Sequence, residues 1–130
     1  MQDLPFVLLV EDEVLVQIEV EQNLWSGGYN VTTAPTGEDA LRLLDASESK
    51  YCALVTDINL GRDKVTGWEV AKNAREKEAN LPIIYMTGNS ADDWTSKGVP
   101  NSVLINKPFA PAQILTAVSH LINAAKLPEV

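Results

Sequence analysis

The sequence predicts an α/β fold in which helices cover both faces of a mostly parallel sheet. Short segments rich in Val, Ile and Leu recur five times, and most of them lack the polar alternation of half-exposed strands. Stretches of a dozen or more residues separate them, which is long enough for crossover helices. Such alternation of strands and helices places the carboxyl ends of all strands along one edge of the sheet.

The five expected strands are Phe6–Val10, Tyr29–Thr33, Cys52–Thr56, Pro82–Thr87 and Ser102–Ile105. The stretch after the first strand fits no single period. A strand-like alternation is formed by Val14, Val16, Ile18 and Val20, whereas a loose helical pattern is formed by Val14, Ile18, Leu24 and Trp25. We expect a helix because the length of the segment up to the Gly27-Gly28 pair suits a helix better than a strand.

The remaining helices have clearer signals. Thr36 and Asp39 have the spacing of a capping box before an apolar helical face. A third helix is bounded by Gly67 and Asn80, with its apolar face formed by Val70, Ala71 and Ala74. The segment 91–97 predicts only a short, polar helix. The last helix has Pro111 in its first turn and an apolar stripe at Ile114, Leu115, Val118, Leu121, Ile122 and Ala125.

The composition indicates a cytosolic protein of one domain. The chain has 130 residues, 45% of them apolar and 22% charged, which is an ordinary globular balance. No apolar run is long enough to cross a membrane, and the N-terminal stretch lacks the pattern of a signal peptide. The net charge of −8 without a basic cluster argues against binding to nucleic acid. The single cysteine, Cys52, lies in an apolar run and is expected to be a buried, inert thiol.

Polar side chains follow several of the expected strands. Glu11 and Asp12 follow the first strand, Asp57 follows the third, Thr87 ends the fourth and Lys107 follows the fifth. Each is unremarkable alone, because an acid after a strand is usually a solvated turn or a helix cap. In a parallel sheet, however, these groups meet at one edge, where ligands of open α/β sheets bind.

The charges at this edge predict a divalent cation. Two like charges 4 Å apart repel by about 4 kcal/mol at an effective dielectric constant near 20. Three ionised carboxylates and one ammonium leave a charge of about −2, which Mg²⁺ would neutralise through hard oxygen ligands. The expected ligands are the carboxylates of Asp12 and Asp57 and the carbonyl oxygen of Asn59. A carboxylate beside a metal, a lysine and a hydroxyl also describes a site for phosphoryl transfer.

Four segments make the chain resemble the receiver domain of two-component response regulators over nearly its whole length. In order, they are LLVEDE (Leu8–Glu13), VTDINL (Val55–Leu60), YMTGNS (Tyr85–Ser90) and INKPF (Ile105–Phe109). The resemblance implies a doubly wound, flavodoxin-like (βα)5 sheet of five parallel strands in the order 2-1-3-4-5. It also implies a cis peptide bond between Lys107 and Pro108. The domain is expected to cover residues 1–126, followed by a loose tail at 127–130.

The resemblance also assigns roles at the sheet edge. It implies that Asp57 accepts the phosphoryl group, that Glu11 and Asp12 form the acidic Mg²⁺ pocket, and that Thr87 and Lys107 contact the phosphate. It implies that the donor is a sensor histidine kinase or a histidine phosphotransfer protein, and that Asn59 and Asn89 flank the water that attacks the phosphoryl group. Such a domain is not an enzyme in the ordinary sense, although it promotes its own phosphotransfer and dephosphorylation.

The chain departs from the family pattern in ways that concern output rather than phosphoacceptance. Leu104 occupies the position of the usual switch aromatic, Asn59-Leu60-Gly61 replaces a frequent Met-Pro, and the helix at 91–97 is short. Output is expected through protein contacts or through phosphate relay. The domain is expected to be a monomer or weak homodimer, and to be free-standing or part of a larger regulator or hybrid kinase. Other residues have ordinary expectations: Trp25 and Trp68 pack at helix–sheet junctions, His120 lies at the surface, and Trp94 is either packed or exposed.

Three alternatives remain open at this point. A phosphatase of the haloacid dehalogenase type also uses an aspartate after a strand, but it needs a second acid where Asn59 stands. A flavodoxin-like FMN carrier needs a phosphate-binding loop after the first strand, where the carboxylates of Glu11, Asp12 and Glu13 would repel a phosphate. A degenerate receiver would serve only for docking. Labelling as an acyl phosphate distinguishes the two, because only an active receiver is labelled.

Overall fold

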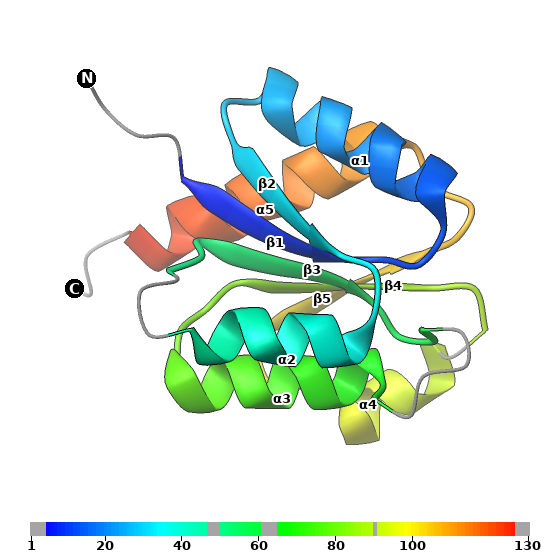
Figure 1. Ribbon diagram of the computed structural model, residues 1–130, viewed down its shortest axis with the longest axis vertical. Helices are drawn as coiled ribbons and strands as arrows, with labels where there is room; N and C mark the ends of the chain where they lie inside the picture. The colour runs from blue at the N-terminus through cyan, green and yellow to red at the C-terminus, as the bar shows by residue number, and fades with distance from the viewer. Residues whose placement is uncertain (1–4, 47–49, 61–64, 90, 127–130) are drawn as a thin grey trace.

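The computed structural model describes residues 5–46, 50–60, 65–89 and 91–126, and the predicted fold is confirmed (Figure 1). Five strands form one sheet in the order β2-β1-β3-β4-β5, and all neighbouring pairs are parallel. The strands are β1 (Phe6–Val10), β2 (Asn30–Ala34), β3 (Ala53–Asp57), β4 (Ile83–Thr87) and β5 (Ser102–Asn106). Their ends differ from the predicted ones by no more than one residue, with Asp57 as the last residue of β3.

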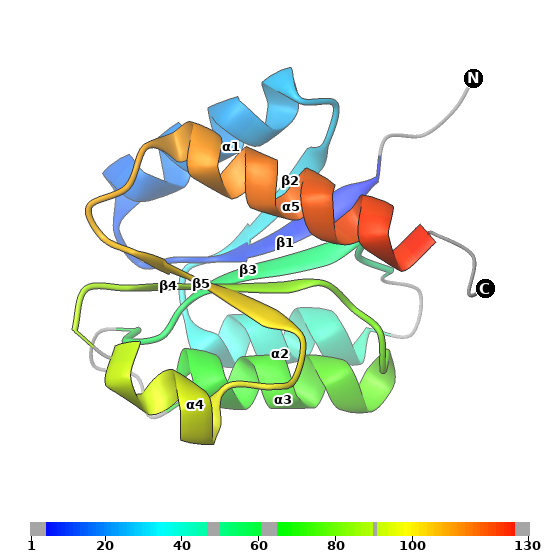
Figure 2. The same ribbon diagram turned by 180° about the vertical axis from the view of Figure 1, so that it is seen from behind.

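Helices follow each strand and cover both faces of the sheet. They are α1 (Val14–Ser26), α2 (Gly37–Asp45), α3 (Gly67–Lys77), α4 (Trp94–Lys97) and α5 (Pro111–Lys126), with a short 3₁₀ turn at Ala91–Asp93 before α4. Helices α1 and α5 lie on one face of the sheet, whereas α2 and α3 lie on the other (Figures 1 and 2). The loose tail expected at 127–130 lies outside the described residues.

Local signals explain where the helices begin. The Thr36 hydroxyl accepts a hydrogen bond from the Asp39 backbone N–H at 3.0 Å, as the capping spacing predicts. Thr66 caps α3 in the same way through the Glu69 N–H, at 3.3 Å. Helix α5 begins at Pro111, as expected. The segment 91–97 forms only the 3₁₀ turn and one turn of α-helix, which agrees with its short, polar sequence.

Alternation along the strands divides the core into two layers. Leu8, Leu54 and Tyr85 face α2 and α3, whereas Val7, Leu9, Val55 and their neighbours face α1 and α5. In β1 and β3 every second side chain therefore points to the α1/α5 layer. This alternation decides on which side the polar residues at the strand ends emerge.

Three of the expectations for single residues need comment. Trp68 packs its ring against Tyr85 with a centroid distance of 4.7 Å, as predicted for a helix–sheet junction. The same prediction for Trp25 is wrong, because its side chain is 56% exposed while Val20 and Leu24 form the buried face of α1. Cys52 is half-buried rather than buried, since it lies one residue before β3 begins.

The other two expectations concern residues near β5. His120 is exposed on α5, as predicted. Trp94 is packed rather than exposed: it lies partly buried against the core layer of α2 and α3, and its indole N–H donates to the Ser102 hydroxyl at 3.0 Å.

Candidate functional site

The register of the sheet brings the predicted residues to one edge. Val10 pairs with Thr56, so Glu11 follows β1 at the level of Asp57. Asp57 pairs with Met86, one residue before Thr87, and Thr87 pairs with Asn106, one residue before Lys107. The backbone continues this order past the strand ends, because the Lys107 N–H donates to the Thr87 carbonyl at 2.7 Å.

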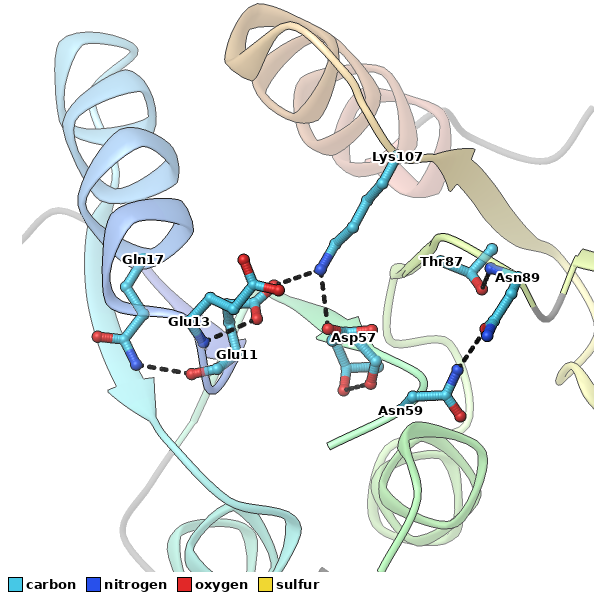
Figure 3. Close-up of polar contacts among 9 residues, drawn as sticks. Glu11, Glu13, Gln17, Asp57, Asn59, Thr87, Asn89 and Lys107 are labelled. Carbon is cyan, nitrogen blue, oxygen red and sulfur yellow. Dashed lines mark hydrogen bonds and ion pairs between the residues drawn. The ribbon is translucent and has the colours of Figure 1, made fainter. Parts of the chain in front are cut away.

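Strand alternation then places three of these side chains together. Glu11 continues the series Val7 and Leu9, and Asp57 continues Ala53 and Val55, so both carboxylates emerge toward the α1/α5 layer. Lys107 continues the series Val103 and Ile105 and points the same way. Thr87 belongs to the opposite series of β4, with Ile83 and Tyr85, and lies at the end of the neighbouring strand (Figure 3).

Lys107 joins the two buried carboxylates. Its Nζ lies 2.8 Å from Asp57 Oδ2 and 3.0 Å from Glu11 Oε1 (Figure 3). Glu11 is fully buried and Asp57 is 5% exposed, so these contacts are largely shielded from solvent. Charge-assisted hydrogen bonds in such an environment are strong and fix the direction of the side chains. The lysine therefore holds Asp57 and Glu11 in a defined arrangement.

Asp12 adds a third carboxylate from the solvent side. One oxygen of each of Glu11, Asp12 and Asp57 lies within 4.8 Å of the others, and Asp12 is exposed whereas the other two are buried. Together with Lys107 the cluster has a charge of about −2 when all groups are ionised. Oxygen ligands at this spacing with excess negative charge suit a hard divalent cation, so the residues fit a Mg²⁺ site.

The pKa values of the site are perturbed by burial. Burial raises the pKa of Glu11 to about 7, and the nearby charge of Asp57 adds to this rise. Burial also raises the pKa of Asp57, against the lowering effect of its hydrogen bond from Lys107. Burial alone would lower the pKa of Lys107, but the hydrogen bonds to Asp57 and Glu11 raise it. The two buried carboxylates thus ionise more readily when further positive charge is close.

The two asparagines lie across the mouth of the site from Lys107 (Figure 3). The Asn59 Nδ2 donates to Asn89 Oδ1 at 2.7 Å, which ties the loop after β3 to the loop after β4. The Asn89 backbone N–H donates to the Thr87 hydroxyl at 3.2 Å. The Asn59 backbone also hydrogen-bonds the Asp57 carboxylate, which places the start of this loop against the site.

Several supporting contacts could not be predicted. The Gln17 amide on α1 donates to the Glu11 carbonyl at 2.6 Å, and the Glu13 N–H donates to Glu11 Oε2 at 3.0 Å. Gly67 lies so close to the acceptor strand that a Cβ there would be 2.1 Å from the Asp57 carbonyl oxygen. Only Gly67 had a signal, its position at the start of a predicted helix. The contact itself depends on tertiary packing.

The fold and this site agree with the family that the sequence matches. Residues 7–119 match the response regulator receiver domain family. The chain therefore belongs to the receiver domains of two-component response regulators, a family whose general role is to accept a phosphoryl group. The peptide bond between Lys107 and Pro108 is cis, as the sequence motif implied.

Solved structures and curated proteins show the same relationship. A response regulator receiver protein from Sinorhizobium medicae is 39% identical, with a TM-score of 0.90 over 95% of this chain and 98% of that one. The receiver domain of a sensor histidine kinase from Pseudomonas aeruginosa, solved with a magnesium ion coordinated in its active site cleft, is 27% identical. Its TM-score is 0.78, over 93% of this chain and 99% of that one.

The alkaline phosphatase synthesis transcriptional regulatory protein PhoP of Bacillus subtilis is 28% identical over 123 residues, which cover 93% of this chain and 50% of PhoP. This chain thus spans about half the length of the curated relatives that it matches. Within the described part of the chain, no helix is both long enough and apolar enough to cross a membrane.

Proposed function

We propose that Asp57 is the phosphoacceptor of this receiver domain. The observation that carries the proposal is the contact of Lys107 Nζ with both Asp57 Oδ2 and Glu11 Oε1, at 2.8 and 3.0 Å. A carboxylate oxygen of Asp57 attacks the phosphorus of a phosphohistidine, and the P–N bond breaks as the P–O bond forms. The electron pair of the broken bond returns to the histidine nitrogen, and Asp57 becomes an acyl phosphate.

Glu11, Asp12 and Asp57, with the carbonyl of Asn59, would hold Mg²⁺. The close spacing of the three carboxylates and their excess charge support this assignment, and the related Pseudomonas aeruginosa receiver domain is described with magnesium in its active site cleft. When bound, the cation would offset charge on the phosphoryl oxygens. The incoming group adds a charge of about −2.

Lys107 and Thr87 are the proposed phosphate contacts of the protein itself. Lys107 orients Asp57 before transfer and offers its ammonium protons to a phosphoryl oxygen afterwards. Thr87 lies at the end of β4, beside Asn89, where its hydroxyl can donate a hydrogen bond to a phosphoryl oxygen. Asn59 and Asn89, joined by their side-chain amides, are proposed to control the approach of the water that hydrolyses the acyl phosphate.

The proposed donor is a sensor histidine kinase or a histidine phosphotransfer protein. We expect a cytoplasmic domain that covers residues 1–126 and acts through protein contacts as a monomer or weak homodimer. We expect it to bind neither nucleic acid nor membrane itself, and not to be an enzyme with a separate substrate. The net charge of −8 supports contacts with basic protein surfaces rather than nucleic acid. The domain can be free-standing or part of a larger regulator or hybrid kinase.

Labelling with a small phosphodonor tests the proposal. Incubation with acetyl phosphate and Mg²⁺ should add one phosphoryl group to the wild-type protein, detectable by intact mass spectrometry. Asp57→Asn should abolish the labelling, because an amide oxygen is not a nucleophile for this reaction. Labelling that persists in Asp57→Asn would refute the assignment. A wild-type protein that is never labelled would instead indicate a receiver that serves only for docking.

A further inference from the structure

The loop between β1 and α1 contains two of the three carboxylates of the candidate site. Glu11 is fully buried and held by Lys107, whereas Asp12 is exposed. Packing therefore does little to aim the Asp12 side chain, and its direction depends on the backbone on either side of it. Asp12 is flanked by two planar peptide units, one shared with Glu11 and one shared with Glu13. The orientation of these two units decides where the Asp12 carboxylate points.

Hydrogen bonds fix both of these peptide units. The unit after Asp12 is held by the Glu13 N–H, which donates to Glu11 Oε2 at 3.0 Å. The unit before Asp12 is held by the Gln17 side-chain amide, which donates to the Glu11 carbonyl oxygen at 2.6 Å (Figure 3). One step further back, the Glu11 N–H donates to the Ala34 carbonyl oxygen at 3.1 Å. Gln17 thus holds the peptide unit through which the chain enters Asp12.

Helix α1 begins without a side-chain cap of the usual kind. Glu13 stands at the N-cap position with an extended backbone, but its side chain makes no capping hydrogen bond. The start of the helix is instead connected to the site through Glu11, which accepts hydrogen bonds from both Glu13 and Gln17. A change at Gln17 therefore acts on the peptide unit before Asp12 and not on a separate helix cap.

The rest of α1 is anchored independently of Gln17. On its inner face, Val20 and Leu24 are fully buried in the core layer of α1 and α5. One turn beyond Gln17, the Glu21 carboxylate accepts a hydrogen bond from the Thr33 hydroxyl of β2 at 2.5 Å. Loss of the Gln17 amide would therefore leave the helix in place and release only the peptide unit that this amide holds.

We propose that Gln17 is a positioning residue for the metal site, which fixes the peptide unit before Asp12 and so aims the Asp12 carboxylate. This inference rests on the proposed role of Asp12 as a Mg²⁺ ligand. Mg²⁺ requires nearly ideal octahedral geometry, whereas Ca²⁺ accepts irregular sets of oxygen ligands. A carboxylate that is aimed in advance therefore favours Mg²⁺ over Ca²⁺. Contacts that orient a metal ligand commonly change metal affinity by about tenfold or more.

The test measures the binding of both cations. Titrations with magnesium chloride and with calcium chloride are followed by NMR through the backbone amides of the loop between β1 and α1. Gln17→Met keeps the length of the side chain but removes the amide donor. We expect it to weaken Mg²⁺ binding about tenfold and Ca²⁺ binding no more than about twofold. With chelator present, its melting temperature should stay within about 5 °C of the wild type, because one hydrogen bond is lost.

Two further variants separate the lost donor from other effects. Gln17→Glu has nearly the same shape, but it replaces the amide donor by an oxygen and adds a negative charge. The added charge alone would strengthen the binding of a cation, so weaker Mg²⁺ binding in this variant is due to the lost donor. Gln22→Met makes the same change as Gln17→Met at an exposed position of α1 and should bind both cations like the wild type.

The outcomes separate this inference from the proposed function. If both Gln17 variants bind Mg²⁺ like the wild type, the positioning role is wrong and the proposed metal site stands. If they fail to fold, or lose affinity for both cations equally, Gln17 serves the fold alone and the inference is overturned. A wild type that binds no Mg²⁺ would overturn the proposed metal site and this inference with it.

Discussion

Replacing Gly67 by Ala places one methyl group against the backbone of the acceptor strand. The new Cβ would lie 2.1 Å from the Asp57 carbonyl oxygen and 2.8 Å from the Ile58 Cα. Both contacts are with backbone atoms, so no side-chain rotation relieves them, and either α3 or the end of β3 must move. Overpacking of this kind costs about 3 kcal/mol, and the better helix propensity of Ala returns no more than about 1 kcal/mol.

Urea unfolding measures this change, and the chain offers a matched control. Gly88 also lies next to the site, but a Cβ there would have no neighbouring atom within 4 Å. We expect Gly67→Ala to lose about 2 kcal/mol in the free energy of unfolding and to be labelled by acetyl phosphate more slowly, because Asp57 moves. Gly88→Ala should stay within about 0.5 kcal/mol of the wild type. Equal stability of the two variants would refute the close contact between Gly67 and Asp57.

Three further predictions concern the groups around Asp57. Lys107→Ala should leave Mg²⁺ binding largely intact but impair phosphorylation, measured by metal titration and acetyl phosphate labelling; unchanged phosphorylation would remove Lys107 from the site. Mg²⁺ should raise the melting temperature by several degrees, because it binds only the folded arrangement of carboxylates, and a melting curve insensitive to chelator would contradict this. Asn59→Ala and Asn89→Ala should each shorten the lifetime of phosphorylated Asp57 by up to about fivefold, which corresponds to the loss of one hydrogen bond. The double variant should shorten the lifetime no further than either single variant, because both remove the same hydrogen bond.

The sequence predicted the edge of the sheet because its signals are local. Apolar runs that end at Glu11 and Asp57 mark both the strand and its carboxyl end. The parallel topology then brings these ends to the same edge of the sheet. Alternation within each run also decides that Glu11, Asp57 and Lys107 emerge on the same side. Few sheet topologies are compatible with five such runs in this order. Because each run stops where its strand stops, the predicted strand ends lie within one residue of those in the structure.

Contacts between elements could not be predicted in the same way. The hydrogen bond from Gln17 to the Glu11 carbonyl depends on how α1 leaves the sheet, and the approach of Gly67 to Asp57 depends on how α3 packs. Helix α1 was ambiguous for a physical reason. Because it has apolar residues on both its inner and its outer face, no single helical stripe stands out. The expectation that Trp25 packs at a helix–sheet junction was wrong, because Trp25 lies on the outer face.

Leu104 excludes the usual response to phosphorylation, because that response needs an aromatic ring at this position of β5. It lies on β5 and packs, partly buried, against the core layer that faces α2 and α3, where a receiver of the usual pattern has a ring that turns inward. Among the described strand residues of this layer, the aromatic ring belongs instead to Tyr85 of β4, which is fully buried and packed against Trp68. Its hydroxyl accepts a hydrogen bond from the Val99 N–H at 3.1 Å.

These contacts hold the Tyr85 ring against Trp68 of α3 and against the backbone that leads into β5. The hydroxyl of Thr87 is instead joined to the following loop through the Asn89 N–H, and Asn89 is joined to Asn59 beside the acceptor. In this chain, the groups that a phosphoryl group would disturb first belong to the two loops at the mouth of the site. The β5 position that serves as a switch elsewhere carries only an aliphatic side chain.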